Sequence, residues 1–128
     1  EIGSGLVGSE MCIRDRMTSV LVSPHGYYEY EAAHGTVQRH YYRHLKGEET
    51  STNSVATIFA WTGALRKRGE MDGNAELSAF ADRLEKATIA TIESGKMTKD
   101  LALITTMENP TVLNSRDFIL AIREELEK

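Results

Sequence analysis

Residues 17–22, with the sequence MTSVLV, constrain the fold most, because nearly every side chain is apolar or β-branched. Such residues favour a β-strand, and the turn-forming residues 23–26 end it. Residues 27–30 then predict the returning strand of a hairpin. A nearly continuous apolar strand is typical of a sheet that is covered on both faces, whereas an isolated hairpin is only marginally stable. The run therefore indicates a piece of a larger α/β protein.

Two long helices are predicted in the middle of the chain. Residues 51–53 offer N-cap oxygens for the first helix, and Gly69 can end it. Gly95 fits the position that follows the second helix. The apolar stripe of the first helix consists of Val55, Ile58, Phe59, Thr62 and Leu65, and that of the second consists of Leu77, Phe80, Ala81, Leu84, Thr88, Thr91 and Ile92.

Two further elements are predicted near the C-terminus. Thr98 can cap a short helix over residues 99–106, for which a strand is the alternative. Pro110 interrupts the chain, and Ser115 with Asp117 begins a last helix that carries Phe118, Ile119, Ile122 and Leu126. The chain is thus predicted to be helix-rich with one short strand pair.

Charge and composition limit the classes of partner. The 128 residues carry a net charge of −4, so the molecule as a whole does not attract nucleic acid or an anionic membrane. No apolar run reaches the roughly 20 residues that span a bilayer. The first residues do not have the order of a signal peptide, and the single Cys12 cannot form an internal disulfide. We expect a soluble protein without nucleic-acid or membrane partners.

Residues 1–16 contain a GxGxxG pattern at positions 3–8 that we set aside. This pattern binds a dinucleotide only between a strand and a helix, and just two residues precede it here. The whole segment resembles translated sequencing-adapter read-through. We expect residues 1–16 to be a non-native segment without stable structure and exclude them from the interpretation of the fold.

The densest group of polar side chains lies in residues 31–53, where a metal site is one hypothesis. Glu31 and His34 have the spacing of a di-iron helix, but such a site needs two of these pairs. A zinc protease has a glutamate directly after its first histidine, whereas Tyr41 follows His40. No metal ligand is therefore assigned.

Two other kinds of ligand remain for the same segment. The basic residues of 39–46 interleave with two tyrosines, a pattern that can contact phosphates and stack on bases. Alternatively, Gly35 allows a ligand to approach the backbone, and Thr36 with exposed N–H groups can cradle a phosphate. Arg39 adds a planar fork and His40 another donor. An anionic small molecule fits best, with nucleic acid as the alternative.

Several ordered motifs carry a resemblance to a known family. Residues 31–41 (EAAHGTVQRHY), 46–53 (KGEETSTN) and 58–62 (IFAWT) resemble the C-terminal region of homodimeric NADP-dependent isocitrate dehydrogenases. The similarity continues through residues 74–78 (NAELS) and 91–102, reaches back to residue 17 and fades after Pro110. It therefore covers nearly everything after residue 16.

The resemblance implies an α/β fold of the isocitrate/isopropylmalate dehydrogenase type, which is not a Rossmann fold. Residues 17–128 would form an incomplete, C-terminal cofactor-binding portion of the large domain. Arg39 and His40 would hold the 2′-phosphate and so select NADP over NAD. The implied cofactor-binding residues are Glu31 near the nicotinamide, His34 near the adenine, Gly35, Thr36, Val37, Gln38, Arg39 and His40 in the loop around the adenosine, and Asn53 bonded to the adenine; Lys99 and Asp100 would also approach the cofactor.

This sequence departs from the family pattern at a few positions. Gln38 stands where threonine is usual, and Ser54 where many members have proline. Gly63 replaces a basic residue and lies inside a predicted helix, which costs about 1 kcal/mol relative to alanine. This last change is expected to weaken the helix locally more than it affects cofactor binding.

The family reaction oxidises isocitrate with NADP and decarboxylates the product with the help of Mg²⁺ or Mn²⁺. The resemblance places the isocitrate-binding, metal-binding and catalytic residues upstream of Met17, so we assign no catalytic residue here and expect the chain alone to be inactive. It also implies a homodimer for the full-length enzyme. A bacterial cytoplasmic protein is the preferred source, with a mitochondrial one as the alternative. The competing interpretation is a stand-alone module that uses residues 39–46 to bind nucleic acid or a nucleotide without catalysis.

Overall fold

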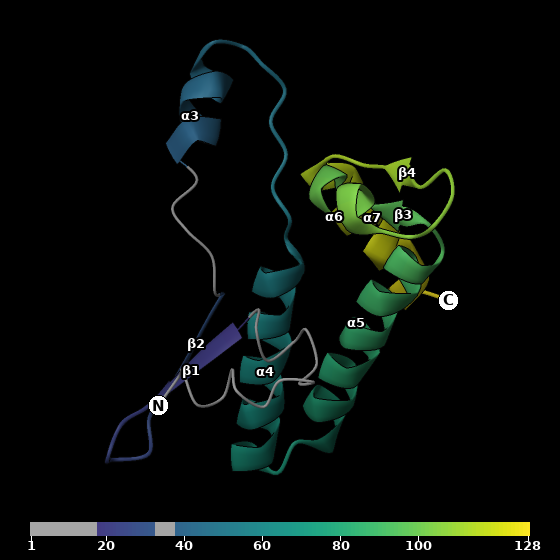
Figure 1. The fold of residues 1–128 in the computed structure, drawn as a ribbon. Coiled ribbons are helices and arrows are strands. Elements are labelled where there is room, and N and C mark those ends of the chain that lie inside the picture. Colours follow the sequence, from purple (N-terminus) through teal and green to yellow (C-terminus); the bar gives the residue numbers. More distant parts are fainter. Residues whose placement is uncertain (1–17, 33–37) are drawn as a thin grey trace. The chain divides into compact units, whose positions relative to one another are not determined.

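The computed structural model describes residues 18–32 and 38–128 (Figure 1). These residues divide into two compact units. The first contains residues 18–32 and 55–85, and the second contains residues 38–54 and 86–128. No helix in the described ranges has the length and apolar character needed to cross a membrane.

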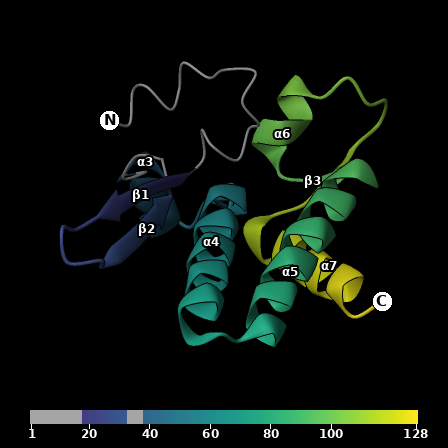
Figure 2. The same ribbon diagram turned by 90° about the horizontal axis from the view of Figure 1, so that it is seen from below.

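The first unit contains the predicted hairpin. Strands β1 (Thr18–Val22) and β2 (Tyr28–Ala32) pair in antiparallel register, with Val20 opposite Tyr30. The hairpin packs on helix α4 (Val55–Asp72), mainly through β2 (Figure 2). The side chains of 20–22 are 42–57% exposed, and among the described residues α4 is the helix that packs most on this strand pair. This exposure agrees with the prediction that the chain is a piece of a larger α/β protein.

Helix α4 does not end at Gly69, contrary to the sequence-based expectation. It continues to Asp72, and Gly73 then adopts a φ of 65° and turns the chain into α5 (Ala75–Glu93). Gly69 is buried because the start of α5 passes close to it: a Cβ atom at this position would lie 2.9 Å from the carbonyl oxygen of Asn74. Gly69 therefore permits close packing of the two helices instead of terminating the first.

Gly63 also allows a close approach, and α4 remains continuous through it. A Cβ atom at this position would lie 2.9 Å from Cε1 of Tyr30, so the tyrosine ring of β2 packs directly on the helix backbone. Burial in this contact raises the pKa of Tyr30, although the nearby Lys67 acts in the opposite direction. The glycine that was expected to weaken the helix is thus required by the hairpin.

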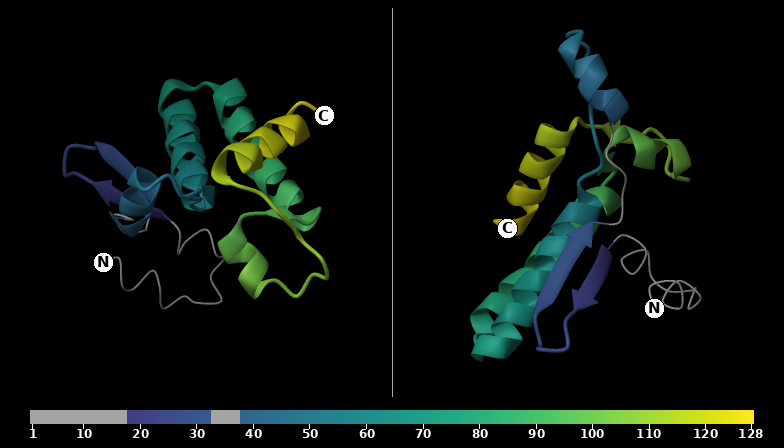
Figure 3. Two further views of the ribbon diagram at one scale, coloured as in Figure 1. Left: turned by 90° about the horizontal axis from the view of Figure 1, so that it is seen from above. Right: turned by 90° about the vertical axis from the view of Figure 1, so that its left-hand side faces the viewer.

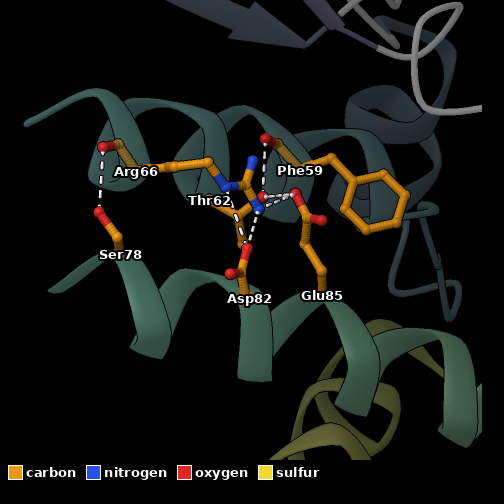
Figure 4. Close-up of polar contacts among 6 residues, drawn as sticks. All are labelled: Phe59, Thr62, Arg66, Ser78, Asp82 and Glu85. Atoms are coloured by element: carbon orange, nitrogen blue, oxygen red, sulfur yellow. Dashed lines mark hydrogen bonds and ion pairs between the residues drawn. The ribbon is translucent and has the colours of Figure 1, made fainter. Parts of the chain in front are cut away.

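Arg66 joins α4 to the first half of α5 (Figure 4). Its Nη2 atom lies 2.7 Å from Oδ1 of Asp82 and 3.1 Å from Oε1 of Glu85. Glu85 is 7% exposed, and the hydroxyl of Thr62 lies 2.8 Å from the same carboxylate oxygen. A buried carboxylate is costly unless it has such partners. Partial burial lowers the pKa of Arg66, but its bonds to the two acids outweigh this and leave the pKa raised.

The second unit has a core around Met97, Phe118 and Ile122, which are at most 3% exposed. Strand β3 (Lys96–Met97) pairs in parallel with β4 (Thr111–Val112), and helix α6 (Lys99–Ile104) lies between them in the sequence. Figure 3 shows how an extended segment joins α6 to α7 (Ser115–Leu126). The helical prediction for residues 99–106 is confirmed over most of its length, and the strand alternative is wrong.

Three details of the second unit concern helix ends. Gly95 has a φ of 96°, as predicted for the residue that follows α5. The cap of α7 is Asn114, whose side chain accepts a hydrogen bond from the Asp117 amide at 2.8 Å, so Ser115 is already helical. Residues 38–45, which the sequence analysis left without regular structure, form helix α3 (Gln38–Leu45).

We expect Gly63→Ala to lower the free energy of unfolding, because the new Cβ atom must displace the Tyr30 ring. In a Tyr30→Ala background the ring is absent, and the same substitution should raise this free energy by about 1 kcal/mol through helix propensity. Urea unfolding of the four proteins measures the coupling. Equal effects of Gly63→Ala in both backgrounds would show that the ring does not constrain this position.

Candidate functional site

Helix α3 places two basic side chains on one face. His40 and Arg43 are three residues apart, a spacing that aligns side chains along a helix. The helix ends at Leu45, Gly47 in the following turn has a φ of 79°, and the amide of Glu48 bonds back to the Arg43 carbonyl at 3.1 Å. The same turn brings Oε2 of Glu48 within 2.7 Å of Nε of Arg43. The end of the helix and the position of the arginine are therefore linked.

The segment after α3, residues 48–54, has no regular secondary structure and is held by Ser115 at the start of α7. The Thr52 amide donates to the Ser115 hydroxyl at 2.8 Å, and this hydroxyl donates to the Thr52 carbonyl at 2.8 Å. A backbone segment outside helices and sheets needs such partners for its N–H and C=O groups. Ser115 supplies both for Thr52.

Asn53 is held by a second contact. Its Nδ2 donates to Oδ2 of Asp100 at 2.8 Å, while Oδ1 of Asp100 accepts from the Thr98 hydroxyl. An ionised carboxylate only accepts hydrogen bonds, so the NH₂ group of Asn53 must face Asp100. The contact thus fixes the orientation of the amide, and it joins two residues that the sequence analysis assigned to the cofactor.

A cavity of about 400 Å³ lies within the second unit, beside α3 and the start of α6. Its volume falls in the range of small-molecule sites, about 300–1,000 Å³. The lining residues are His40, Arg43, Glu49, Thr50, Ser51, Lys99, Val112, Leu113 and Asn114.

Basic groups dominate the charge of the cavity wall. Arg43 and Lys99 carry positive charge, His40 adds an imidazole, and Glu49 is the acidic residue of the lining. Within the part of the chain that the structure describes, Nδ1 of His40 is buried and has no hydrogen-bond partner. A buried polar atom without a partner is uncommon in folded proteins. The site is suited to a small anion with hydrogen-bonding capacity.

The predicted cofactor residues are placed as follows. Gln38 and Arg39 form the exposed first turn of α3, and Arg39 is not among the cavity-lining residues. Glu31 lies in β2 of the first unit, where it accepts a hydrogen bond from the Ser19 hydroxyl at 2.8 Å. His34, Gly35, Thr36 and Val37 lie outside the described residues. Cofactor contacts for all of these residues stay predictions.

The sequence analysis missed Arg43, Ser51 and Asn114 as lining residues. The signal for Arg43 was the three-residue spacing from His40, which has meaning only once residues 38–45 are a helix. For metals, the described ranges contain no group of three or more His, Cys, Asp or Glu side chains that could hold an ion.

We expect Ser115→Ala to release the segment 48–54. Removing both bonds to Thr52 should speed amide hydrogen exchange at Thr52 and lower the free energy of unfolding by about 1 kcal/mol. Exchange measured by NMR tests this. Ser94→Ala, which removes a hydroxyl bond to the Thr91 carbonyl in the same unit, should leave exchange at Thr52 unchanged. Unaltered amide exchange at Thr52 in Ser115→Ala would show that Ser115 does not hold the segment 48–54.

Comparison with known proteins places the chain in a family. The sequence profile of the isocitrate/isopropylmalate dehydrogenase family matches residues 4–122. The match includes residues 4–16, whose assignment to a non-native segment stays a prediction.

Individual relatives are similar over most of the chain. Cytosolic isocitrate dehydrogenase (NADP) of Arabidopsis thaliana is 55% identical over 116 residues, which is 88% of this chain and 28% of the relative. The mitochondrial isocitrate dehydrogenase (NADP) of Sus scrofa is 52% identical over 118 residues, 88% of this chain and 28% of the relative. Isocitrate dehydrogenase (NADP) 1 of Mycobacterium tuberculosis is 54% identical over 113 residues, 88% of this chain and 27% of the relative. The chain thus spans little more than a quarter of these proteins, and it belongs to the isocitrate/isopropylmalate dehydrogenase family.

Proposed function

We propose that this chain contributes the adenosine 2′-phosphate side of the NADP site in an NADP-dependent isocitrate dehydrogenase. That enzyme oxidises isocitrate, forms NADPH and releases 2-oxoglutarate after decarboxylation. The observation that carries the proposal is the basic cavity beside α3, in a chain 52–55% identical to proteins named isocitrate dehydrogenase (NADP). The nucleic-acid alternative is not favoured, since these relatives are dehydrogenases.

The chemistry of the residues fits the ligand. A 2′-phosphate on the adenosine ribose is a dianion at neutral pH, and Arg39 with His40 offers a fork of donors and an imidazole to it. His40 lines the cavity, where its imidazole can donate a hydrogen bond to such a group. NAD has no phosphate at this position, so these side chains would favour NADP.

The adenine is assigned to Asn53, whose amide is held by Asp100. An amide presents a donor and an acceptor, and its carbonyl oxygen can accept two hydrogen bonds. We assign His34 and residues 35–38 to the loop around the adenosine, and Glu31 to the nicotinamide side. When bound, NADP accepts a hydride from the substrate.

The chemical steps are assigned to residues outside this chain. We assign neither a metal ligand nor a catalytic residue to it, so the divalent Mg²⁺ or Mn²⁺ of the complete enzyme would be held elsewhere. Hydride transfer requires both partners in near-attack geometry, and the cofactor side alone cannot provide this. We therefore propose that the chain by itself does not turn over isocitrate, that the complete protein is a homodimer, and that it acts in a bacterial cytoplasm.

The test is the selectivity of the 128-residue chain for NADP over NAD, measured by calorimetry. We expect the chain to bind NADP more tightly than NAD. The Arg39→Ala substitution should lower the affinity for NADP by about tenfold or more, because one charge-assisted contact is lost, and should leave the affinity for NAD unchanged. Arg68→Ala serves as the control, since Arg68 pairs with Asp72 in the first unit.

Two outcomes would overturn the proposal. One is equal affinity of the unaltered chain for both dinucleotides. The other is salt-dependent binding of oligonucleotides that is abolished when Arg39 and Arg43 are neutralised, which would favour the nucleic-acid alternative.

A further inference from the structure

Arg43 lines the cavity, unlike Arg39, which was assigned to the 2′-phosphate. It lies near the end of α3 and lines the cavity together with His40, one turn earlier, and Lys99 of α6. The sequence placed Arg43 only in the basic stretch 39–46 considered for nucleic acid, and the family resemblance assigned it no role. Its place in the cavity wall lets its guanidinium group contact a ligand bound there.

The ion pair with Glu48 holds the Arg43 side chain without saturating it. Glu48 accepts from Nε at 2.7 Å, which uses one of the five N–H donors of the guanidinium group. The two Nη groups carry the other four donors, and their fork geometry matches a phosphate. Both side chains of the pair are about half exposed, at 56% and 47%, so the pair is weak and yields to a better acceptor.

The other charges around the cavity have both signs. Arg43 and Lys99 supply positive charge, and His40 adds an imidazole. Glu49 on the same wall opposes anion binding, as does Glu48 beside Arg43. Net charge therefore does not select the ligand, and binding depends on direct charge-assisted hydrogen bonds, several of which the oxygens of one phosphate monoester can accept from Arg43, Lys99 and His40.

We propose that Arg43 is a further specificity-determining residue, which binds the phosphate monoester of the ligand in the cavity together with His40 and Lys99. This inference rests on the proposed function and adds one residue to its 2′-phosphate subsite. The bond from Nε to Glu48 restrains the guanidinium group beside the turn that follows α3. The ligand class is a nucleotide that carries a terminal phosphate monoester in addition to its diphosphate.

The experiment compares 2′,5′-ADP with 5′-ADP as probes, using calorimetry on the 128-residue chain. The two probes differ in the position of a phosphate group, so their affinity ratio reports on the 2′-phosphate subsite. The Arg43→Gln substitution should lower the affinity for 2′,5′-ADP by about tenfold and leave the affinity for 5′-ADP unchanged. Arg43→Lys retains the charge but not the fork, and should lose part of this affinity. Arg116→Gln, a cation of α7 that is absent from the cavity lining, is the control for general charge effects.

The outcomes separate this inference from the proposed function. If the unaltered chain does not prefer 2′,5′-ADP over 5′-ADP, the proposed function and the role of Arg43 are both overturned. If it does, and Arg39→Ala abolishes the preference while Arg43→Gln and Arg43→Lys bind both probes as the unaltered chain does, the role of Arg43 alone is overturned. If Arg43→Gln weakens the binding of both probes and alters the circular dichroism spectrum, the Arg43→Lys variant is used instead. Unchanged selectivity of that variant for 2′,5′-ADP over 5′-ADP overturns the proposal, and reduced selectivity supports it.

Discussion

The candidate site depends on the hydroxyl of Ser115, which holds the irregular segment 48–54 at the start of α7. Ser115 is placed by the Asn114 cap, and the chain just before it pairs as β4 with β3. Strand β3 in turn leads through Thr98 into α6, where Asp100 binds Asn53. One short parallel strand pair therefore positions both contacts that fix the segment. The cavity wall at Lys99, Leu113 and Asn114 comes from the same two connections.

The charge of the site is local. The chain carries a net charge of −4, yet the cavity brings together Arg43, Lys99 and His40. At physiological salt the Debye length is about 8 Å, so a ligand in the cavity senses mainly these neighbours. Their individual contributions are small where the side chains are exposed, and selectivity for a dianion must come from several of them acting together. The acids Glu48 and Glu49 offset part of this positive charge.

Periodicity and turn chemistry predicted the long elements correctly, because they are local properties. The hairpin, α5, α6 and α7 follow from apolar spacing and from residues that favour turns or caps. Helix α3 was missed because no apolar stripe marks it and no cap residue was recognised before it, whereas Thr98 marked the start of α6, which also has no buried residue. Gly69 was misread as a helix end, since its function depends on the close passage of α5, which no local pattern reveals.

Residue chemistry and the family motifs both pointed to Arg39 and His40, and the motifs alone pointed to Asn53. In the structure His40 lines the cavity and Asn53 bonds to Asp100, while the cofactor contacts of all three stay predictions. The partnership of Thr52 with Ser115 could not be predicted, because 63 residues separate them in the sequence. The position of Arg43 beside His40 depends on helix α3, which the sequence pattern did not predict. Contacts between distant segments thus account for most of what sequence reasoning missed.

The most direct test of the central claim is an NMR map of the chain titrated with 2′-AMP, the smallest ligand that carries the 2′-phosphate. The account predicts the largest amide shifts at residues 39–43, 99–100 and 113–114, around the cavity of the second unit. Amides in the middle of α4, in the first unit, should not move. Shifts that concentrate in the first unit, or no shifts at a large excess of 2′-AMP, would contradict the assignment of the phosphate site.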